Sequence, residues 1–351
     1  MYQGFNVEKH IIGHGHKPFV IAEMSANHNQ SLNRAIQIVE AAAQAGVHAL
    51  KLQTYTADTL TIDERDNEFF ISDKSSLWYG KSLYELYQSA YTPWEWHEPI
   101  FKRCRELGII AFSTPFDATA VNFLETLNVP LYKIASFDII NLELIKAVAK
   151  TGKPVIISTG LANLSEISEA VQTVQAAGCN KLVLLKCTST YPASPIDSNI
   201  LTIPSMHSIF KCPIGLSDHT LGIGAAIASI ALGACVIEKH FTLSRSDGGV
   251  DSAFSMEPTE MKQLVVESER AYDSLGKISY EPTKNEIVSM RYRRSLYIVK
   301  DLKAGDRLNN NNIRAIRPGL GLSPKYYPLM MGKKINRDIK RGTPLSWDFI
   351  E

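Results

Sequence analysis

The sequence predicts a (β/α)8 barrel followed by a small, mostly β domain. The first observation is that short apolar runs alternate with helical segments eight times within about 260 residues, which is the rhythm of such a barrel. The second is that the runs are apolar throughout, as strands of a parallel sheet covered by helices must be. The third is that this rhythm stops after Gly276, where short segments separated by turns begin.

The expected strands and helices follow one another in pairs along the chain. Strands are predicted at residues 18–24, 48–54, 109–114, 131–136, 154–160, 181–187, 213–217 and 235–241. Helices are predicted at residues 32–45, 94–107, 118–127, 142–150, 164–177, 200–209, 223–232 and 258–275. Gly46 and Gly108 directly follow two of these helices, and a left-handed glycine commonly ends a helix. An open doubly wound sheet is the alternative, but no glycine-rich nucleotide-binding motif follows the first strand.

The connection between the second strand and its helix, residues 55–93, is too long for a simple loop. Long loops on the catalytic face of a barrel usually shape access to the site. This insertion and the residue that follows it are rich in aromatic side chains: Phe69, Phe70, Trp78, Tyr84, Tyr87, Tyr91 and Trp94. Such side chains either line a sugar pocket or pack the loop onto the barrel, and we expect packing for most of them.

Composition is that of an ordinary globular protein, since 45% of the 351 residues are apolar and 21% are charged. The start of the chain lacks the pattern of a signal peptide, and no apolar run reaches the length of a membrane span. The five cysteines show no CxxC spacing, which favours reduced thiols over disulfides or zinc. We therefore expect a cytoplasmic protein without a membrane partner.

The C-terminal part predicts a separate module. We place the barrel at residues 1–276, a linker at 277–290 and the module at 291–351. The module contains 14 Lys and Arg against 5 Asp and Glu, a charge of +9, so the rest of the chain carries −8 of the total +1. Basic surfaces can bind nucleic acid, but these charges are scattered among turns without an aromatic platform. We expect no nucleic acid, and a role in docking on an acidic body or in holding an anionic substrate.

Polar residues gather at the C-terminal ends of the predicted strands, where a barrel carries its active site. Lys51, Lys133 and Lys186 lie inside apolar runs, and burying an unpaired ammonium group is costly. With nearby hydroxyl groups they indicate an anion site, most simply for a phosphate and a carboxylate. His219 and His240 follow the last two strands, and imidazole pairs commonly bind divalent metal ions. This combination suggests carbon–carbon bond formation between phosphoenolpyruvate and an aldehyde.

Segments along nearly the whole chain resemble the sialic acid synthase family. The barrel segments, in order, are AEMSANHNQS, LKLQTY, STPFD, YKIAS, IISTG, LLKCTSTYP, GLSDHTLG and VIEKHFT. The tail segments AGDRL, IRPGLG and GKKINRDIKRGTPL resemble that family's antifreeze-like (SAF) domain. Within the family, LQTYTADT, EFFI, SLWYGKSLYELY and TPWEWH look like the pseudaminic acid synthase branch. N-acetylneuraminate and legionaminate synthases of the same family are the alternatives.

The resemblance implies a transferase that condenses phosphoenolpyruvate with an N-acetylated 6-deoxy hexose, 2,4-diacetamido-2,4,6-trideoxy-L-altrose. It implies a divalent cation on His219 and His240, with Mn2+ expected and Co2+ or Mg2+ as alternatives. Glu23 and Asp138 are the implied catalytic carboxylates beside the two histidines, and which of them is the base stays open. The implied substrate-binding residues are Asn27, Lys51, Gln53, Thr114, Lys133, Ser136, Ser158, Lys186, Thr188, Tyr191, Ser217 and Arg317.

By the same resemblance, the tail caps the barrel of a partner subunit in a domain-swapped homodimer, with Arg317 reaching the sugar. Ser189 and Asp138 differ from residues that relatives carry, so whether they keep the family roles stays open. Two other classes of protein also stay open. A lysine of the mouth could form a Schiff base, as in metal-independent aldolases, or a degenerate barrel could carry a glycan-binding tail without catalysis.

Overall fold

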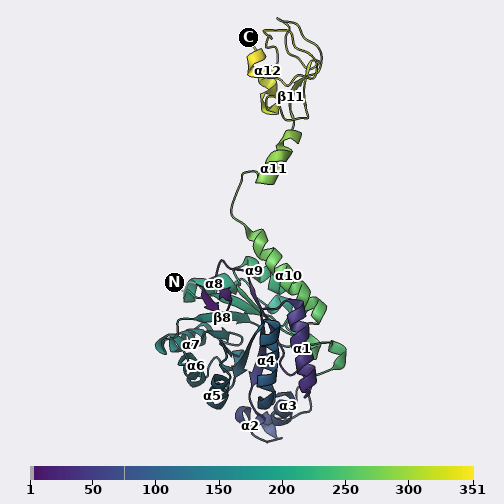
Figure 1. The fold of residues 1–351 in the computed structure, drawn as a ribbon. Helices are drawn as coiled ribbons and strands as arrows, with labels where there is room; N and C mark the ends of the chain where they lie inside the picture. Colours follow the sequence, from purple (N-terminus) through teal and green to yellow (C-terminus); the bar gives the residue numbers. More distant parts are fainter. Residues whose placement is uncertain (1–3, 75) are drawn as a thin grey trace. The chain divides into compact units, whose positions relative to one another are not determined.

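The chain folds as two compact units, one ending at Gly276 and the other beginning at Lys277. The computed structural model describes residues 4–74 and 76–351. In these residues eight parallel strands close into a barrel in the order β10-β3-β4-β5-β6-β7-β8-β9, and helices surround it (Figure 1). The prediction of a (β/α)8 barrel is confirmed.

The elements follow the predicted order, and their ends shift by a few residues. The barrel strands are β3 (Phe19–Glu23), β4 (Ala49–Thr54), β5 (Ile110–Pro115), β6 (Tyr132–Ile134), β7 (Val155–Ser158), β8 (Leu182–Cys187), β9 (Ile214–Ser217) and β10 (Val236–His240). The helices that follow them are α1 (Leu32–Ala45), α4 (His97–Leu107), α5 (Ala118–Thr126), α6 (Leu142–Ala149), α7 (Leu164–Ala176), α8 (Thr202–Phe210), α9 (Gly224–Ala231) and α10 (Pro258–Leu275). Among the residues described, no helix combines the length and the apolar character that crossing a membrane requires.

Alternation along each strand decides which side chains enter the barrel. In β10, Val236 packs with the apolar residues of the barrel interior, and Ile237 packs with the layer between strands and helices. The same parity turns Glu238 and His240 inward and Lys239 outward, toward the helices. Every strand that repeats this pattern therefore delivers its last inward side chain to one layer at the C-terminal mouth.

An apolar layer fills the barrel below this mouth, toward the N-terminal ends of the strands. It contains Phe19 of β3 and Phe112 of β5, together with Val7 and Ile12 of a hairpin formed by β1 (Phe5–Val7) and β2 (His10–Ile12). The hairpin closes the floor of the barrel. The sequence analysis expects no strand there, because strands of three residues are too short to show an alternating pattern.

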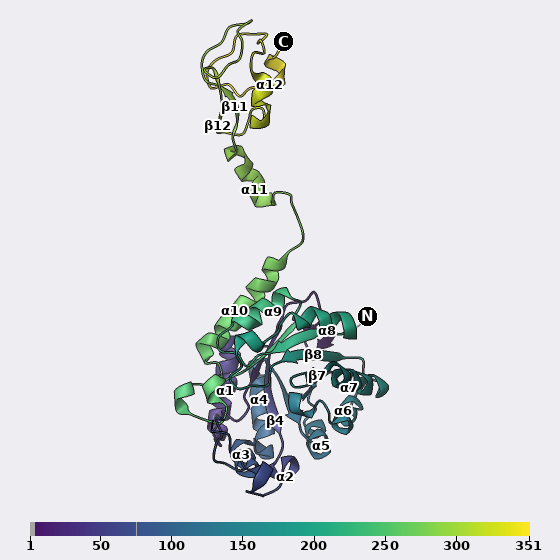
Figure 2. The same ribbon diagram turned by 180° about the vertical axis from the view of Figure 1, so that it is seen from behind.

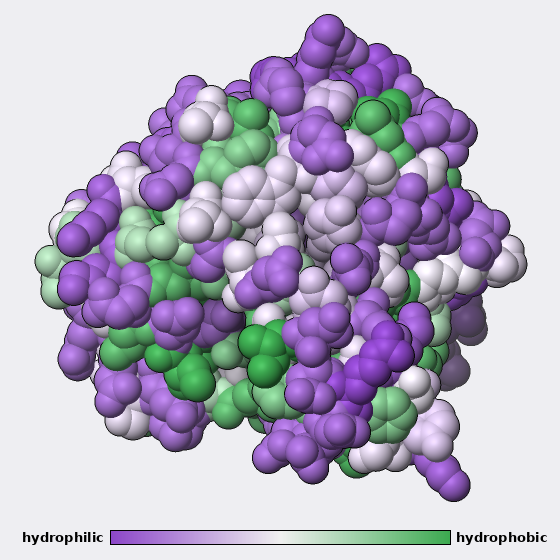
Figure 3. Space-filling view, turned by 90° about the horizontal axis from the view of Figure 1, so that it is seen from below, coloured by the Kyte–Doolittle hydropathy of each residue, from purple (hydrophilic) through white to green (hydrophobic). Residues whose placement is uncertain are grey.

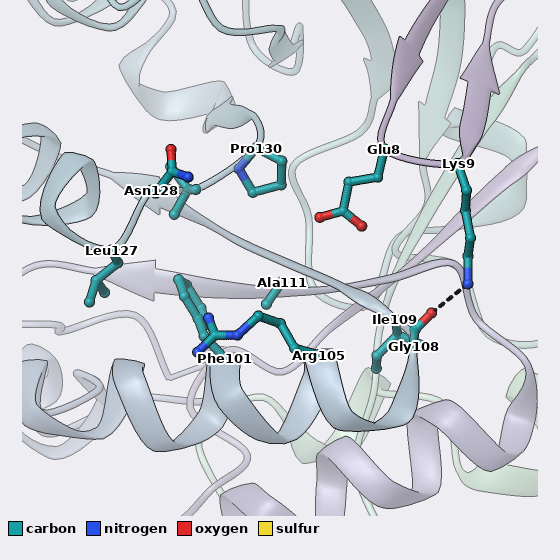
Figure 4. Close-up of a pocket in the computed structure, with 11 residues that line it drawn as sticks. Glu8, Lys9, Phe101, Arg105, Gly108, Ile109, Ala111, Leu127, Asn128 and Pro130 are labelled. Atoms are coloured by element: carbon teal, nitrogen blue, oxygen red, sulfur yellow. Dashed lines mark hydrogen bonds between the residues drawn. The ribbon is translucent and has the colours of Figure 1, made fainter.

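A hollow of about 220 Å3 lies beside this hairpin (Figure 4). Glu8, Arg105 and Pro130 are among the residues that line it, and Lys9 donates a hydrogen bond of 2.9 Å from its Nζ to the carbonyl oxygen of Gly108. Because the lining comes from the N-terminal ends of strands and the C-terminal ends of helices, the hollow lies at the opposite end of the barrel from the polar mouth.

The insertion between β4 and α4 forms α2 (Ala57–Leu60) and α3 (Leu83–Ala90). Tyr87 packs against Tyr55 with ring centroids 6.0 Å apart, and Trp94, after the insertion, stacks on Phe123 at 4.7 Å. These rings therefore pack, as expected for most aromatic residues of this segment. Seen from the side of α2 and α3, the surface carries small apolar groups separated by hydrophilic side chains (Figure 3).

The second unit has its own core. β11 (Ser295–Ile298) pairs antiparallel with β12 (Ile313–Ile316), as Figure 2 shows, and α12 (Tyr327–Met330) follows them. Leu296, Ile313 and Met330 pack together inside, which confirms the prediction of a small module with a β-sheet. Residues 277–290, predicted as a linker, contain the helix α11 (Lys284–Ser289), whose start is stabilised by a capping box between Thr283 and Glu286.

Candidate active site

Buried charges of opposite sign meet at the mouth of the barrel. The Nζ of Lys51 lies 2.6 Å from Oε2 of Glu23 and 3.8 Å from Oε1 of Glu238. Lys133 is 2% exposed, and its Nζ donates a hydrogen bond of 2.8 Å to the carbonyl oxygen of Ile134. Because burying one charge alone is costly, the two ammonium groups and the two carboxylates stabilise one another.

The pKa shifts show which of these charges is least compensated. Burial opposes the charge on Lys51, but Glu23 and Glu238 outweigh burial and raise its pKa. Burial lowers the pKa of Lys133 in spite of Glu238, and it raises the pKa of Glu23 in spite of Lys51. Burial also opposes the charge on Glu238, but Lys133 and Lys51 overcome it and lower the pKa. An anion entering the mouth would stabilise the charge on Lys133 most.

Hydroxyl groups form a cradle next to these charges, around Gly160. The backbone nitrogen of Gly160 donates a hydrogen bond of 3.1 Å to Oγ of Ser136. A Cβ atom at this position would lie 2.8 Å from that hydroxyl and would also collide with Ser189, so only glycine fits. Oγ of Ser158 is buried and has no hydrogen-bond partner among the residues described. A buried hydroxyl without a partner is expected to bond to a ligand or to water.

His219 and His240 face each other across the mouth, with ring centroids 5.3 Å apart. Nδ1 of His219 lies 2.9 Å from the carbonyl oxygen of Thr188. A carbonyl can only accept, so Nδ1 donates to it, and Nε2 is the nitrogen that could bind a metal ion. Burial opposes a charge on His219, but Cys187 and the bond to Thr188 outweigh burial and raise its pKa, so a metal ion would have to displace a proton from Nε2. Burial holds the pKa of His240 well below its ordinary value, so this ring is neutral. Its Nδ1 has no hydrogen-bond partner among the residues described and lies 3.8 Å from Oδ2 of Asp251.

These features fit a divalent cation, which requires neutral imidazoles and outer partners that fix their orientation. The residues described contain no group of three or more His, Cys, Asp and Glu placed to hold a metal ion. The protein would therefore supply two imidazoles, and the remaining ligands would come from water and substrate. That leaves open coordination positions, as a catalytic site needs.

Several of the predicted residues join this mouth. Nε2 of Gln53 donates a hydrogen bond of 3.0 Å to Oε1 of Glu23. Thr114 accepts one of 3.2 Å from Nζ of Lys51, and Ser217 donates one of 3.1 Å to Oε1 of Glu238. The ring of Tyr191 lies 4.5 Å from that of His219. Asp138 is half-buried next to Ser136, and burial raises its pKa to about 6.

Other predicted residues lie elsewhere. Lys186 follows the inward Leu185 in β8, so it starts outward, and its Nζ bonds to the carbonyl oxygen of Cys187 at 2.9 Å. The side chain of Asn27 spans the loops after β3 and β10 by donating to the carbonyl oxygen of Phe241 and to Ser255. The hydroxyl of Thr188 donates to the carbonyl oxygen of Asp197. Arg317 is an exposed residue that directly follows β12 in the second unit.

The structure also brings in residues absent from the predicted site. Sγ of Cys187 lies 3.8 Å from Nδ1 of His219; burial opposes ionisation of this thiol, but His219 outweighs burial and lowers the pKa to about 7. Asp251 is buried and bonds to the hydroxyl of Ser25. Strand parity could have predicted Cys187 and Glu238. Nothing in the pattern could have predicted Asp251, because it lies in an irregular loop.

The fold and this mouth define an enzyme of the (β/α)8 barrel class. Residues 38–280 match the NeuB family and residues 293–351 match the SAF domain. The chain belongs to the NeuB family and carries a C-terminal SAF domain, as the sequence analysis predicts.

Its relatives match over nearly their whole length. The pseudaminic acid synthase of Helicobacter pylori is 42% identical over 95% of this chain and 98% of that protein. The pseudaminic acid synthase of Campylobacter jejuni is 41% identical over 97% of both. The N,N'-diacetyllegionaminic acid synthase of Legionella pneumophila is 37% identical over 95% of this chain and 94% of that protein.

A solved structure shows the same fold. The N-acetylneuraminic acid synthetase of Leptospira borgpetersenii aligns with a TM-score of 0.74 and 33% identity, over 83% of this chain and 96% of that chain. The similarity to synthases of three different sugar acids shows the family, and these relatives differ in the sugar that their names specify.

Proposed function

We propose that this protein is a pseudaminic acid synthase. It would condense phosphoenolpyruvate with 2,4-diacetamido-2,4,6-trideoxy-L-altrose and water to give pseudaminic acid and phosphate. The observation that carries this proposal is the identity of about 41–42% to two pseudaminic acid synthases over nearly the full chain. It exceeds the 37% found for the Legionella legionaminate enzyme, so the legionaminate and neuraminate activities remain the second candidates.

The proposed reaction requires an anion site, and the mouth supplies one. Lys51 and Lys133 would hold the phosphate and carboxylate of phosphoenolpyruvate, together with the hydroxyls of Thr114, Ser136 and Ser158. Lys133 is the under-compensated cation of the mouth, and the hydroxyl of Ser158 lacks a partner among the residues described. Both features support a role in binding this anion.

Bond formation would proceed at the open-chain aldehyde. Carbon 3 of phosphoenolpyruvate attacks the carbonyl carbon, and the aldehyde oxygen takes up a proton to become a hydroxyl. Water adds to carbon 2, loses a proton, and the C–O bond to phosphate breaks, leaving a ketone at carbon 2. A divalent cation on His219 and His240, with Mn2+ as the proposed ion, would polarise the aldehyde.

We propose Asp138 as the proton carrier of the two carboxylates. A general base works best when its pKa lies near the working pH, and burial raises the pKa of Asp138 to about 6. Glu23 is fixed instead by its ion pair with Lys51 and its hydrogen bond from Gln53. We assign Glu23 the task of orienting Lys51 and the sugar hydroxyls.

A phosphate-release assay tests this function. Purified protein is mixed with phosphoenolpyruvate and either the diacetamido L-altrose, the legionaminate precursor or N-acetylmannosamine, with and without chelator. We expect kcat/KM to be highest by far for the L-altrose sugar. A preference for either other sugar would move the assignment to that branch. Trapping of a covalent adduct by borohydride would instead support a Schiff-base aldolase.

We propose two further properties. The five cysteines are all free and buried, which supports a reducing, cytoplasmic location. The resemblance to the family supports a homodimer in which the SAF domain of one chain reaches the barrel of the other.

A further inference from the structure

Trp78 of the insertion is fixed at the rim of the mouth. Its Nε1 donates a hydrogen bond of 3.0 Å to the carbonyl oxygen of Val250, a residue in the loop after β10. This bond joins two segments that lie 172 residues apart in the sequence. The ring therefore has a defined place on the rim, although the insertion that carries it is largely exposed.

An aromatic row connects Trp78 with the two histidines. Its ring centroid lies 6.2 Å from that of Tyr191, which lies 4.5 Å from that of His219. Phe254 lies 5.2 Å from Tyr191 and 4.9 Å from His240. The row begins where the aldehyde is proposed to react and ends at Trp78, so one wall of the mouth is aromatic along its length. Aromatic faces bind the apolar C–H groups of sugars and acyl groups.

A hollow of about 370 Å3 adjoins the outer end of this row. It is lined by the side chains of Leu77, Trp78, Lys81, Ser89, Val250 and Ala253 and by Gly249. Three of these side chains are aliphatic, while the ammonium group of Lys81 and the hydroxyl of Ser89 are polar. This mixture suits a group with both methyl and amide parts, such as an acetamido substituent, better than it suits a hydroxyl alone.

Apart from its configuration, the proposed substrate differs from N-acetylmannosamine in the substituents at the end of the sugar that is far from the aldehyde. Carbon 4 carries an acetamido group in place of a hydroxyl, and carbon 6 is a methyl group in place of a hydroxymethyl group. If carbon 1 reacts beside His219 and His240, carbons 4 to 6 would extend along the aromatic row. We infer that Trp78 and the hollow beside it form the subsite that selects the 4-acetamido and 6-methyl groups. This inference rests on the proposed function.

Removing the ring tests the subsite. The readout is the discrimination, as the ratio of kcat/KM values, between the diacetamido 6-deoxy sugar and the same sugar with a hydroxyl at carbon 6. We expect Trp78→Ala to lower this ratio about 10- to 100-fold, the range usual for one apolar group in a pocket, and to leave the KM for phosphoenolpyruvate unchanged. Trp94→Phe is the matched control, because Trp94 also donates from Nε1 to a backbone oxygen, that of Tyr55 at 3.3 Å, but stacks on Phe123.

Filling the hollow provides a second variant that deletes no contact. Ala253 is exposed, so Ala253→Leu adds volume at the proposed subsite, and we expect the KM for the diacetamido sugar to rise at least about 10-fold with an unchanged melting temperature. This variant decides the question if Trp78→Ala fails to fold. Unaltered discrimination and sugar KM in the folded variants would overturn the subsite alone. Failure of the unaltered protein to use the 6-deoxy sugar would overturn the proposed function instead.

Discussion

Lys51 and Glu23 form an ion pair of 2.6 Å in which both side chains are almost completely buried. The pair joins neighbouring strands β4 and β3, whose register places these two residues opposite each other. Alternation turns both side chains into the barrel, and closure of the barrel excludes water from them. The charges that the proposed reaction uses are therefore also charges that the fold must keep balanced.

The balance predicts coupled effects on stability. Lys51→Met leaves Glu23 without its main partner and Glu238 without one of its two cations, and breaking a buried pair in this way costs about 3–5 kcal/mol. We expect the double variant Lys51→Met/Glu23→Gln to recover part of that lost stability, although the single and the double variant are both inactive. Chemical denaturation of the four proteins measures the coupling. Lys181→Met, at an exposed position, is the control, and additive losses in the double variant would contradict the pairing.

Lys133 and Lys186 should contribute very differently to the binding of phosphoenolpyruvate. Both ammonium groups bond to the carbonyl oxygen of the next residue. The side chain of Lys133 points into the barrel and is 2% exposed, whereas that of Lys186 leaves β8 on the outer side. We expect Lys133→Met to raise the KM for phosphoenolpyruvate roughly 100-fold, the value of one lost charge-assisted contact of up to about 3 kcal/mol. Lys186→Met should raise it far less. If steady-state kinetics show equal rises in this KM for the two variants, Lys186 must turn into the mouth when substrate binds.

The sequence predicts the barrel and most of the mouth because both depend on simple periodicities. Strands buried on both faces give continuous apolar runs, so the polar residues at their ends, such as Lys51 and Thr114, stand out. Lys186 shows the limit of this argument. A polar residue near a strand end suggests a site whether its side chain points inward or outward. Only alternation along β8, counted from the inward Leu185, shows that Cys187 points inward and Lys186 outward.

Residues in irregular segments could not be predicted in this way. Asp251 and Val250 lie in the loop after β10, and their meeting with Ser25 and Trp78 depends on loop paths that no periodicity encodes. The hairpin at the floor of the barrel is not predicted either, because its three-residue strands are too short to show an alternating pattern.

Metal removal should abolish turnover. We expect activity to disappear in excess chelator and to return with Mn2+, because a cation held by His219 and His240 would polarise the aldehyde. His219→Ala should prevent the return and weaken Mn2+ binding measured directly by electron paramagnetic resonance. His207→Ala is a matched control, since His207 bonds to the carbonyl oxygen of Cys212 near the floor. Full turnover by verified metal-free protein would exclude this role.

Asp138 predicts a particular pH profile. As a base it must be ionised, and its pKa is about 6, so kcat should fall tenfold per pH unit below that value. Because the folded pKa lies above the unfolded value near 3.8, the folded state binds more protons, and this carboxyl lowers stability as the pH rises from about 4 to 6. Asp138→Asn should therefore abolish the acidic limb of the residual activity. Its gain in melting temperature over the unaltered protein should be larger at pH 8 than at pH 4. An unchanged limb would exclude Asp138 as the base.

Arg317 tests the proposed exchange of SAF domains between subunits. The module that carries it has a charge of +9 against −8 for the rest of the chain, which favours association at low salt. If Arg317 reaches the sugar, Arg317→Ala should lower kcat/KM roughly 10- to 100-fold, as for a lost hydrogen bond from a charged group, without lowering the melting temperature. Arg314→Ala, at an exposed position on β12, serves as the control for charge alone.

Mixing two variants then shows which chain supplies the arginine. Chains with Arg317→Ala are combined with chains with His219→Ala, and exchange of subunits is verified by mass spectrometry of labelled protein. If the arginine acts on the partner's barrel, each mixed dimer contains one site with both His219 and Arg317 intact and one site lacking both. Activity should therefore rise above that of either variant alone, to about half of the unaltered protein per mixed dimer. If each chain supplies its own arginine, every site lacks one residue, and no activity returns although the subunits have exchanged.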